Sequence, residues 1–155
     1  MVSAGGEKLK IREMTVADAA EAARLEQECF SMPWSQKIYE STLANPDTFY
    51  LVAEEDTGDG KLFVGMCGFQ NILGEADISN VAVREGFRRQ GIAEKLMRLL
   101  LEEGRRQGIE AFTLEVRNSN EAAIRLYEKF GFVTEGVRKR FYEKPVEDAL
   151  IMWLR

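Results

Sequence analysis

The chain has 155 residues, of which 45% are apolar and 30% charged, and its formal net charge is −5. This length is typical of one domain with its own core, the acidic balance argues against direct nucleic-acid binding, and no apolar run approaches the roughly 20 residues of a membrane-spanning helix. The chain has no histidine, which excludes Ser–His and Cys–His catalytic pairs and His-ligated metals.

Strand and helix patterns alternate along the whole chain, without a repeat or a linker. Capping residues open the predicted helices, and glycine or proline closes most of them. We predict a cytoplasmic α+β domain over residues 1–155, with 1–7 as a ragged lead-in. In chain order the elements are a strand at 8–13, helices at 15–28 and 35–45, strands at 49–54, 62–72 and 76–83, a helix at 90–106, a strand at 111–117, a helix at 118–130, and strands at 132–137 and 149–153.

The turn between the strand at 76–83 and the following helix has the character of a phosphate-binding site. N–H groups at the start of a helix have no intrahelical partner and carry the positive end of the helix dipole. Gly91 and Ala93 are small enough for a ligand to lie against the backbone, and Arg88 and Arg89 add positive charge. The turn matches neither a Walker loop nor a dinucleotide fingerprint. The alternative interpretation is an ordinary turn with solvated arginines.

Glu115 is a candidate catalytic carboxylate in the strand at 111–117. Strand alternation places it on the face opposite Leu114 and Val116. The strand–helix–strand unit that ends here should be parallel, and ligands of such units lie beyond the carboxyl ends of the strands. The alternative is a structural ion pair with Arg117 or another basic neighbour.

The helix at 118–130 supplies two further candidates, Asn120 at its start and Tyr127 on the face that also carries Ala123 and Phe130. In the simpler interpretation, Asn120 is only a cap and Tyr127 is a half-buried aromatic residue whose hydroxyl group is satisfied.

These features occur in the order found in the GCN5-related N-acetyltransferase (GNAT) superfamily, which the chain resembles over nearly its whole length. The phosphate-loop pattern of that family, Arg or Gln, x-x-Gly-x, then Gly or Ala, is matched by Arg88, Gly91 and Ala93. Within the superfamily the chain is most similar to the bacterial RimI type, which acetylates the N-terminal alanine of ribosomal protein eighteen of the small subunit. The stretches that carry this similarity are 32–35, 80–83, 89–91, 114–120, 126–128 and 147–149.

The resemblance implies an α+β GNAT fold: a central mixed, mostly antiparallel sheet, helices on both faces, and a parallel strand pair splayed around an acetyl-CoA site. It implies a single N-acetyltransferase domain with acetyl-CoA as co-substrate and no metal. Glu115 would be the proton acceptor and Tyr127 the proton donor. The residues implied to bind acetyl-CoA are Val81, Ala82 and Val83 for the pantetheine arm and acetyl carbonyl, Arg88, Arg89, Gln90, Gly91, Ile92, Ala93 and Glu94 for the pyrophosphate, and Asn120 for the cofactor arm.

Fewer residues of the sequence point to the part of the site that would bind the acceptor. Residues 138–142 resemble a basic-then-aromatic segment of the family in which two tyrosines often sit together, but Phe141 replaces the first of them. The candidate acceptor-binding residues are Trp34, Glu75, Asp77 and Tyr142; for Trp34, Glu75 and Asp77 the alternative is plain packing and solvation.

We expect acetyl transfer to a protein N-terminal α-amine, above all that of the ribosomal alanine. The sequence leaves the oligomeric state open. The alternatives are acetylation of other N-termini, of lysines or of a small amine, and a CoA-binding sensor module that catalyses nothing.

Overall fold

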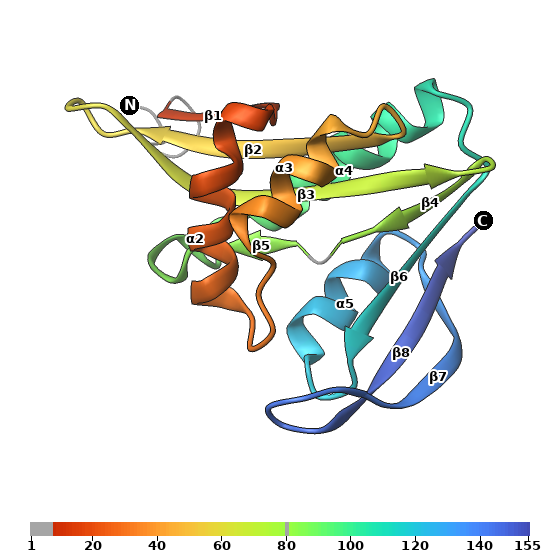
Figure 1. The fold of residues 1–155 in the computed structure, drawn as a ribbon. Coiled ribbons are helices and arrows are strands. Elements are labelled where there is room, and N and C mark those ends of the chain that lie inside the picture. Colours follow the sequence, from red (N-terminus) through yellow and green to blue (C-terminus); the bar gives the residue numbers. More distant parts are fainter. Residues whose placement is uncertain (1–7, 80) are drawn as a thin grey trace.

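The computed structural model describes residues 8–79 and 81–155, so the expected lead-in at 1–7 lies outside the described residues. The described chain forms one mixed sheet with helices on both faces (Figure 1). The helices are α2 (Ala19–Cys29), α3 (Gln36–Ala44), α4 (Ile92–Arg106) and α5 (Glu121–Lys129). The strands are β1 (Leu9–Glu13), β2 (Thr48–Asp56), β3 (Lys61–Ile72), β4 (Glu75–Ile78), β5 (Ala82–Val83), β6 (Ala111–Arg117), β7 (Val133–Tyr142) and β8 (Glu147–Leu154).

The helices begin and end where the capping residues predict. The Thr15 N–H donates to Asp18 Oδ2 at 2.8 Å in front of α2, and Ser35 Oγ accepts from the Ile38 N–H at 3.2 Å at the start of α3. Gly108 follows α4 with a φ of +87°, a left-handed conformation that glycine adopts without strain. Local sequence therefore fixes the helix boundaries to within a few residues.

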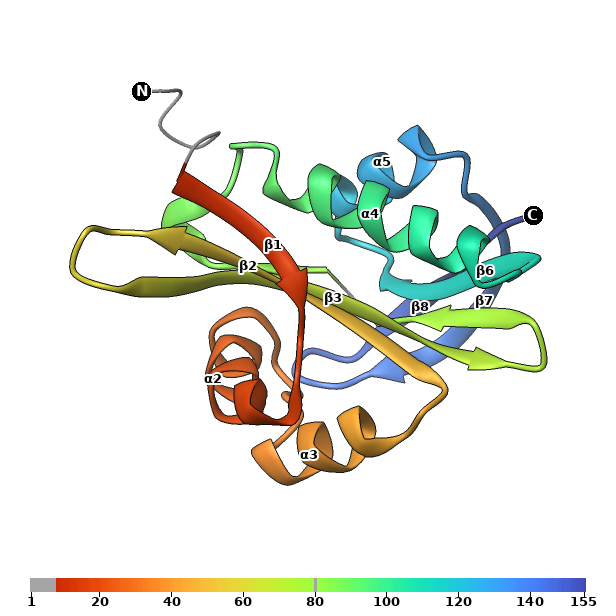
Figure 2. The same ribbon diagram turned by 90° about the horizontal axis from the view of Figure 1, so that it is seen from above.

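Two hydrophobic cores lie on the two faces of the sheet. Figure 2 shows α4 and α5 on one face and α2 and α3 on the other. Leu96, Met97 and Leu100 of α4 pack on the first face, and Leu25 and Tyr39 pack on the second. Because the strands between them are buried on both faces, they read as nearly continuous apolar runs. Leu99 of the same helix is 40% exposed and lies outside this core.

The order of strands is β1-β2-β3-β4-β6-β8-β7, with β5 paired to β3. The pair β4–β6 is parallel, with Asp77 opposite Thr113, and the other pairs among the described strands are antiparallel. These observations confirm the mixed, mostly antiparallel sheet with one parallel pair that the family resemblance implies.

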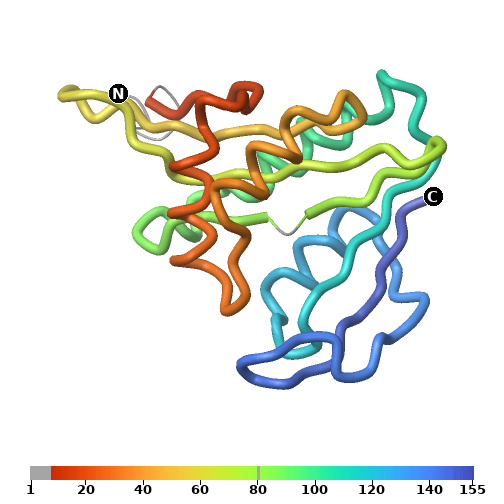
Figure 3. The backbone as a smooth tube through the Cα atoms, viewed as in Figure 1, coloured from red at the N-terminus to blue at the C-terminus, as the bar shows by residue number. Residues whose placement is uncertain are grey.

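The strand predicted at 76–83 is wrong as one element, because the structure divides it into β4 and β5. Phe69 of β3 pairs with Ile78, whereas Met66 pairs with Ala82, so the register shifts by one residue between the two strands. Ser79 donates to the Gly68 carbonyl through both its N–H (2.9 Å) and its hydroxyl group (3.2 Å). An extra residue of this kind breaks the ladder and turns the strand. Beyond it β5 diverges from β6 (Figure 3).

Candidate active site

The predicted phosphate cradle forms an open helix N-terminus. Arg89 and Gly91 have left-handed backbone conformations, with φ of +65° and +79°. The first hydrogen bond of α4 runs from Lys95 N to Gly91 O at 3.1 Å, so the N–H groups of residues 92–94 precede the helical ladder. A Cβ added to Gly91 would meet no heavy atom within 4 Å. The exposed backbone and its dipole fit a pyrophosphate group.

Two charged side chains of this loop bind within the protein. Arg88 Nε donates to the Val83 carbonyl at 2.9 Å and so braces the loop against β5. Glu94 pairs with Lys129 of α5 at 2.8 Å and with Arg98 at 2.9 Å, and these bonds lower the pKa of its carboxyl group. The side chain of Glu94 therefore joins α4 to α5, so its backbone, rather than its carboxylate, is available to the predicted phosphate site.

Glu115 lies on β6 on the face that carries α2 and α3. The strand alternates as predicted, with Leu114 and Val116 each 1% exposed toward the α4 core and the Glu115 side chain 29% exposed on the other face. Its carboxylate forms an ion pair with Arg138 Nε. Arg138 lies on β7, on the far side of β8, so the partner differs from Arg117, which the sequence put forward first.

Asp77 lies on the same face of the sheet as Glu115, the face that carries α2 and α3. It lies opposite Thr113 in the parallel pair, and Thr113 and Glu115 alternate onto one face of β6. Partial burial and the negative charge of Glu115 raise the pKa of Asp77, and Arg138 opposes this rise. The two carboxylates are therefore coupled and lie at the point where β4 and β6 begin to diverge.

Tyr127 points from α5 to the broken strand. It is 1% exposed, and its hydroxyl oxygen receives a backbone hydrogen bond from Val81. Burial raises the pKa of the hydroxyl group, and the Val81 hydrogen bond opposes this rise. The structure thus brings Tyr127 together with the segment predicted to hold the acetyl group, while Asn120 caps α5 by accepting from the Ala123 N–H at 3.3 Å.

The acceptor candidates are two aromatic residues, Trp34 and Tyr142, and two acidic residues, Glu75 and Asp77. Trp34 follows α2, and its ring packs edge-to-face on Tyr39 with the centroids 5.3 Å apart. Tyr142 ends β7 and lies beneath the Arg117 guanidinium, 4.5 Å from its ring centroid. Glu75 and Asp77 are exposed on β4. Asn80 belongs to a matched stretch, but it lies outside the described residues.

Sequence reasoning missed the buried carboxyl group of Glu26. This residue of α2 is 8% exposed, and it accepts from the Tyr39 hydroxyl group at 2.6 Å and from the Trp34 N–H at 3.3 Å. It therefore holds the connection between α2 and α3 in place. The signal for it was helical periodicity, because Glu26 follows Ala22 by four residues on the buried face of α2.

The free energy of unfolding is expected to depend on pH through Glu26. Burial raises the pKa of its carboxyl group, although the bonds from Tyr39 and Trp34 oppose this. The folded state then binds this proton more tightly than the unfolded state, so stability falls as pH rises from about 4.5 through the raised pKa. Relative to Glu26→Gln, the wild type should lose stability over this range in urea unfolding. The control Glu21→Gln, at a partly exposed position of the same helix, shows what the loss of a carboxylate from α2 does in general. Curves for the wild type and Glu26→Gln that run parallel would contradict the expectation.

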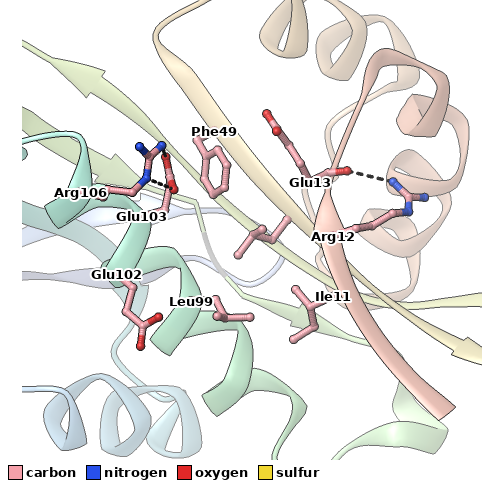
Figure 4. Close-up of a pocket in the computed structure, with 9 residues that line it drawn as sticks. Ile11, Arg12, Glu13, Phe49, Leu99, Glu102, Glu103 and Arg106 are labelled. Atoms are coloured by element: carbon pink, nitrogen blue, oxygen red, sulfur yellow. Dashed lines mark hydrogen bonds and ion pairs between the residues drawn. The ribbon is translucent and has the colours of Figure 1, made fainter. Parts of the chain in front are cut away.

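A groove of about 350 Å3 lies elsewhere, between β1, β2 and the second half of α4 (Figure 4). Ile11, Phe49 and Leu99 form its apolar part, and Glu103 and Arg106 form an ion pair at its rim. It contains none of the predicted site residues. Within residues 8–79 and 81–155, no group of three acidic or cysteine side chains is arranged to hold a metal ion. No helix in that part of the chain has the length and apolar character needed to span a bilayer.

The fold and this site together define a class of protein. The model of the acetyltransferase (GNAT) family matches residues 19–132. A ribosomal protein bS18-alanine N-acetyltransferase of Escherichia coli K12 is 36% identical over 146 residues, which are 93% of this chain and 95% of that protein. The N-alpha-acetyltransferase RimI of Mycobacterium tuberculosis is 32% identical over 158 residues, covering 97% and 95%.

A solved structure agrees with these similarities. The crystal structure of the ribosomal-protein-S18-alanine N-acetyltransferase from Escherichia coli has a TM-score of 0.84 and 32% identity, and it covers 94% of this chain and 92% of that chain. The chain belongs to the GNAT family of acetyltransferases. It is an acetyl-CoA-dependent N-acetyltransferase, with the RimI type among its relatives.

Proposed function

We propose that this enzyme transfers an acetyl group from acetyl-CoA to a protein N-terminal α-amine, and that its acceptor is the N-terminal alanine of ribosomal protein bS18. The observation that carries this proposal is the Glu115 carboxylate, which lies on β6 just past the last residue pair of the parallel β4–β6 ladder and is paired with Arg138. The acceptor is suggested by relatives named for it that align over more than nine-tenths of the chain. A ribosomal acceptor would also keep the reaction in the cytoplasm.

The donor site is argued from backbone groups. The N–H groups that precede the helical ladder of α4 would hold the pyrophosphate, with Arg89 beside them. Residues 81–83, which follow the register shift and include the short strand β5 paired with β3, would bind the pantetheine arm and the acetyl carbonyl. When bound, acetyl-CoA supplies the acetyl group as a thioester.

Glu115 would remove the proton of the acceptor amine. An α-amine has a pKa near 7.7–8.0, against about 10.4 for lysine, so about a tenth of it is already neutral at pH 7. For the fraction of amine that is still protonated, the carboxylate takes up the ammonium proton, directly or through a water molecule, at a modest free-energy cost. Backbone N–H groups near Val83 would stabilise the negative charge that develops on the carbonyl oxygen.

Tyr127 would supply the proton for the departing sulfur. A tyrosine hydroxyl group is protonated at neutral pH, and burial raises the pKa of this one further. A donor of this kind stabilises a thiolate by a hydrogen bond as the charge develops and then gives up the proton. No residue needs to carry the acetyl group, so a chain without histidine can perform the reaction.

The test is thiol release from acetyl-CoA with a peptide that begins with the N-terminal sequence of bS18. We expect release with the unmodified amine, almost none when the α-amine is blocked, and an acetyl group located by mass spectrometry on the first residue. Equal release with both peptides would overturn the α-amine assignment in favour of a lysine acceptor. If acetyl-CoA binds but no amine supports release, the sensor module is the better description.

A further inference from the structure

We propose that Arg117 is a positioning residue that fastens together the two segments of the acceptor side, the α2–α3 connection (residues 30–35) and the β7–β8 turn (residues 143–146). We call these contacts the Arg117 latch. The inference rests on the proposed function, because it assigns a role in acceptor binding. Arg117 ends β6 two residues after Glu115 and therefore lies on the same face of the sheet.

On one side the latch holds the β7–β8 turn. Arg117 Nη1 donates to the Pro145 carbonyl at 2.9 Å, and Nη2 donates to the Glu143 carbonyl at 2.7 Å. The guanidinium also lies 4.5 Å from the ring centroid of Tyr142. Two carbonyl groups and one aromatic face thus fix the path of the turn relative to β6.

On the other side the latch reaches the α2–α3 connection, over a hundred residues away in the sequence from the turn that it meets. Arg117 Nη2 donates to Ser31 Oγ at 2.8 Å, and the Ser31 hydroxyl group donates to the Glu143 carbonyl at 3.1 Å. The Glu143 N–H contacts Met32 Sδ at 3.3 Å. The two segments approach each other at the same end of the molecule (Figure 3).

Glu147 connects the latch to the cofactor side. Its carboxylate accepts from Arg117 Nη1 at 3.2 Å and from the Ser119 N–H at 2.5 Å, just before α5 begins. These bonds hold the pKa of Glu147 below its ordinary range, so the carboxylate stays charged near neutral pH. The residue that orders the acceptor segments is thereby linked to the helix that carries Tyr127.

The chemistry of the latch requires arginine. The planar guanidinium offers five N–H donors in a fixed fork and stacks on an aromatic ring, whereas a lysine ammonium is a flexible point charge that reaches fewer acceptors at once. Tyr142 immediately precedes the β7–β8 turn and lies against the Arg117 guanidinium, and Trp34 follows Ser31 by three residues in the α2–α3 connection. Arg117 therefore helps to place both residues, together with the Glu26 and Tyr39 contacts of Trp34, and it does not itself belong to the reacting groups.

The experiment compares the wild type with Arg117→Met, Arg117→Lys and Ser31→Ala, using the bS18 peptide. We expect the KM for the peptide to rise about tenfold or more in Arg117→Met, since small misplacements of substrate-positioning groups are costly. The kcat at saturating peptide and the Kd for CoA should stay within about twofold. Arg117→Lys should recover part of the loss. Arg125→Met, which removes an exposed ion pair on α5, is the matched control and should leave all three values unchanged.

Two further measurements test the Arg117 latch. Ser31→Ala should raise the KM in the same direction, and its effect should not add to that of Arg117→Lys, because both break one contact. Amide hydrogen exchange should become faster in segments 30–35 and 143–146 of the Arg117 variants, whether or not the peptide is a substrate. An unchanged KM together with unchanged exchange would overturn the latch. A wild type that acetylates no N-terminus would instead overturn the proposed function and leave the exchange result to decide the latch.

Discussion

Glu115→Gln is expected to lower kcat by about 10²- to 10⁴-fold, the usual contribution of a positioned general base, while the Kd for acetyl-CoA stays within about threefold. Glutamine keeps the size of the side chain but cannot take a proton from the amine. The remaining rate should depend more steeply on pH, because only acceptor that is already neutral can react. Single-turnover acetyl transfer over a pH series, with CoA binding measured separately, checks both parts.

The control for this variant is Arg138→Met, which breaks the same ion pair from the other side. The pair is partly exposed, and such pairs contribute about 0.2–1 kcal/mol to stability. If Glu115 served only as the partner of Arg138, the two variants would lose similar amounts of activity and stability. We expect Arg138→Met to retain kcat within about tenfold. Equal losses in both variants would assign Glu115 a structural role.

Tyr127→Phe is expected to lower kcat by about 10- to 10²-fold, less than the base, because water can replace part of a proton donor. The variant also leaves the Val81 backbone without the hydroxyl group that it contacts, and an unpaired buried group costs about 1–3 kcal/mol of stability. Urea unfolding therefore has to accompany the kinetics. A loss of kcat in a variant that is still fully folded at the assay temperature reports on catalysis.

Tyr142→Phe provides the comparison at a second tyrosine. Tyr142, beneath Arg117, is a proposed acceptor-binding residue, so its replacement should act on the KM for the peptide and spare kcat. If Tyr127→Phe instead left kcat unchanged with all acceptors, proton donation would have to come from another group. A substrate with a more acidic leaving thiol should partly restore the rate of Tyr127→Phe, because such a thiolate needs a proton less.

Local patterns predicted much of the fold because they depend on neighbouring residues. The period of two in β6 placed Glu115 opposite Leu114 and Val116, as the burial of these residues confirms. The caps at Ser35 and Asn120 marked the first turns of α3 and α5. Each of these signals is contained within a few residues of the chain.

The features that the sequence concealed depend on distant partners. The division between β4 and β5 arises from the one-residue shift against β3 and from the double contact of Ser79 with Gly68. No residue pattern within 76–83 indicates this division, since the whole run is compatible with a single strand. In the same way, Arg138 reaches Glu115 across β8, which no spacing in the sequence could indicate.

The divergence of β5 from β6 also has a consequence for the order in which the two substrates bind and the two products leave. Glu115 lies on the face of the sheet that carries α2 and α3, whereas Tyr127 packs with α4 and α5 on the opposite face. If the donor and the acceptor reach the diverging strands from these two faces, neither has to pass the other. Both can then be bound at once, and we expect intersecting initial-velocity lines rather than the parallel lines of a ping-pong reaction. The acetylated peptide can then leave while CoA is still bound, so turnover does not have to wait for CoA to dissociate first.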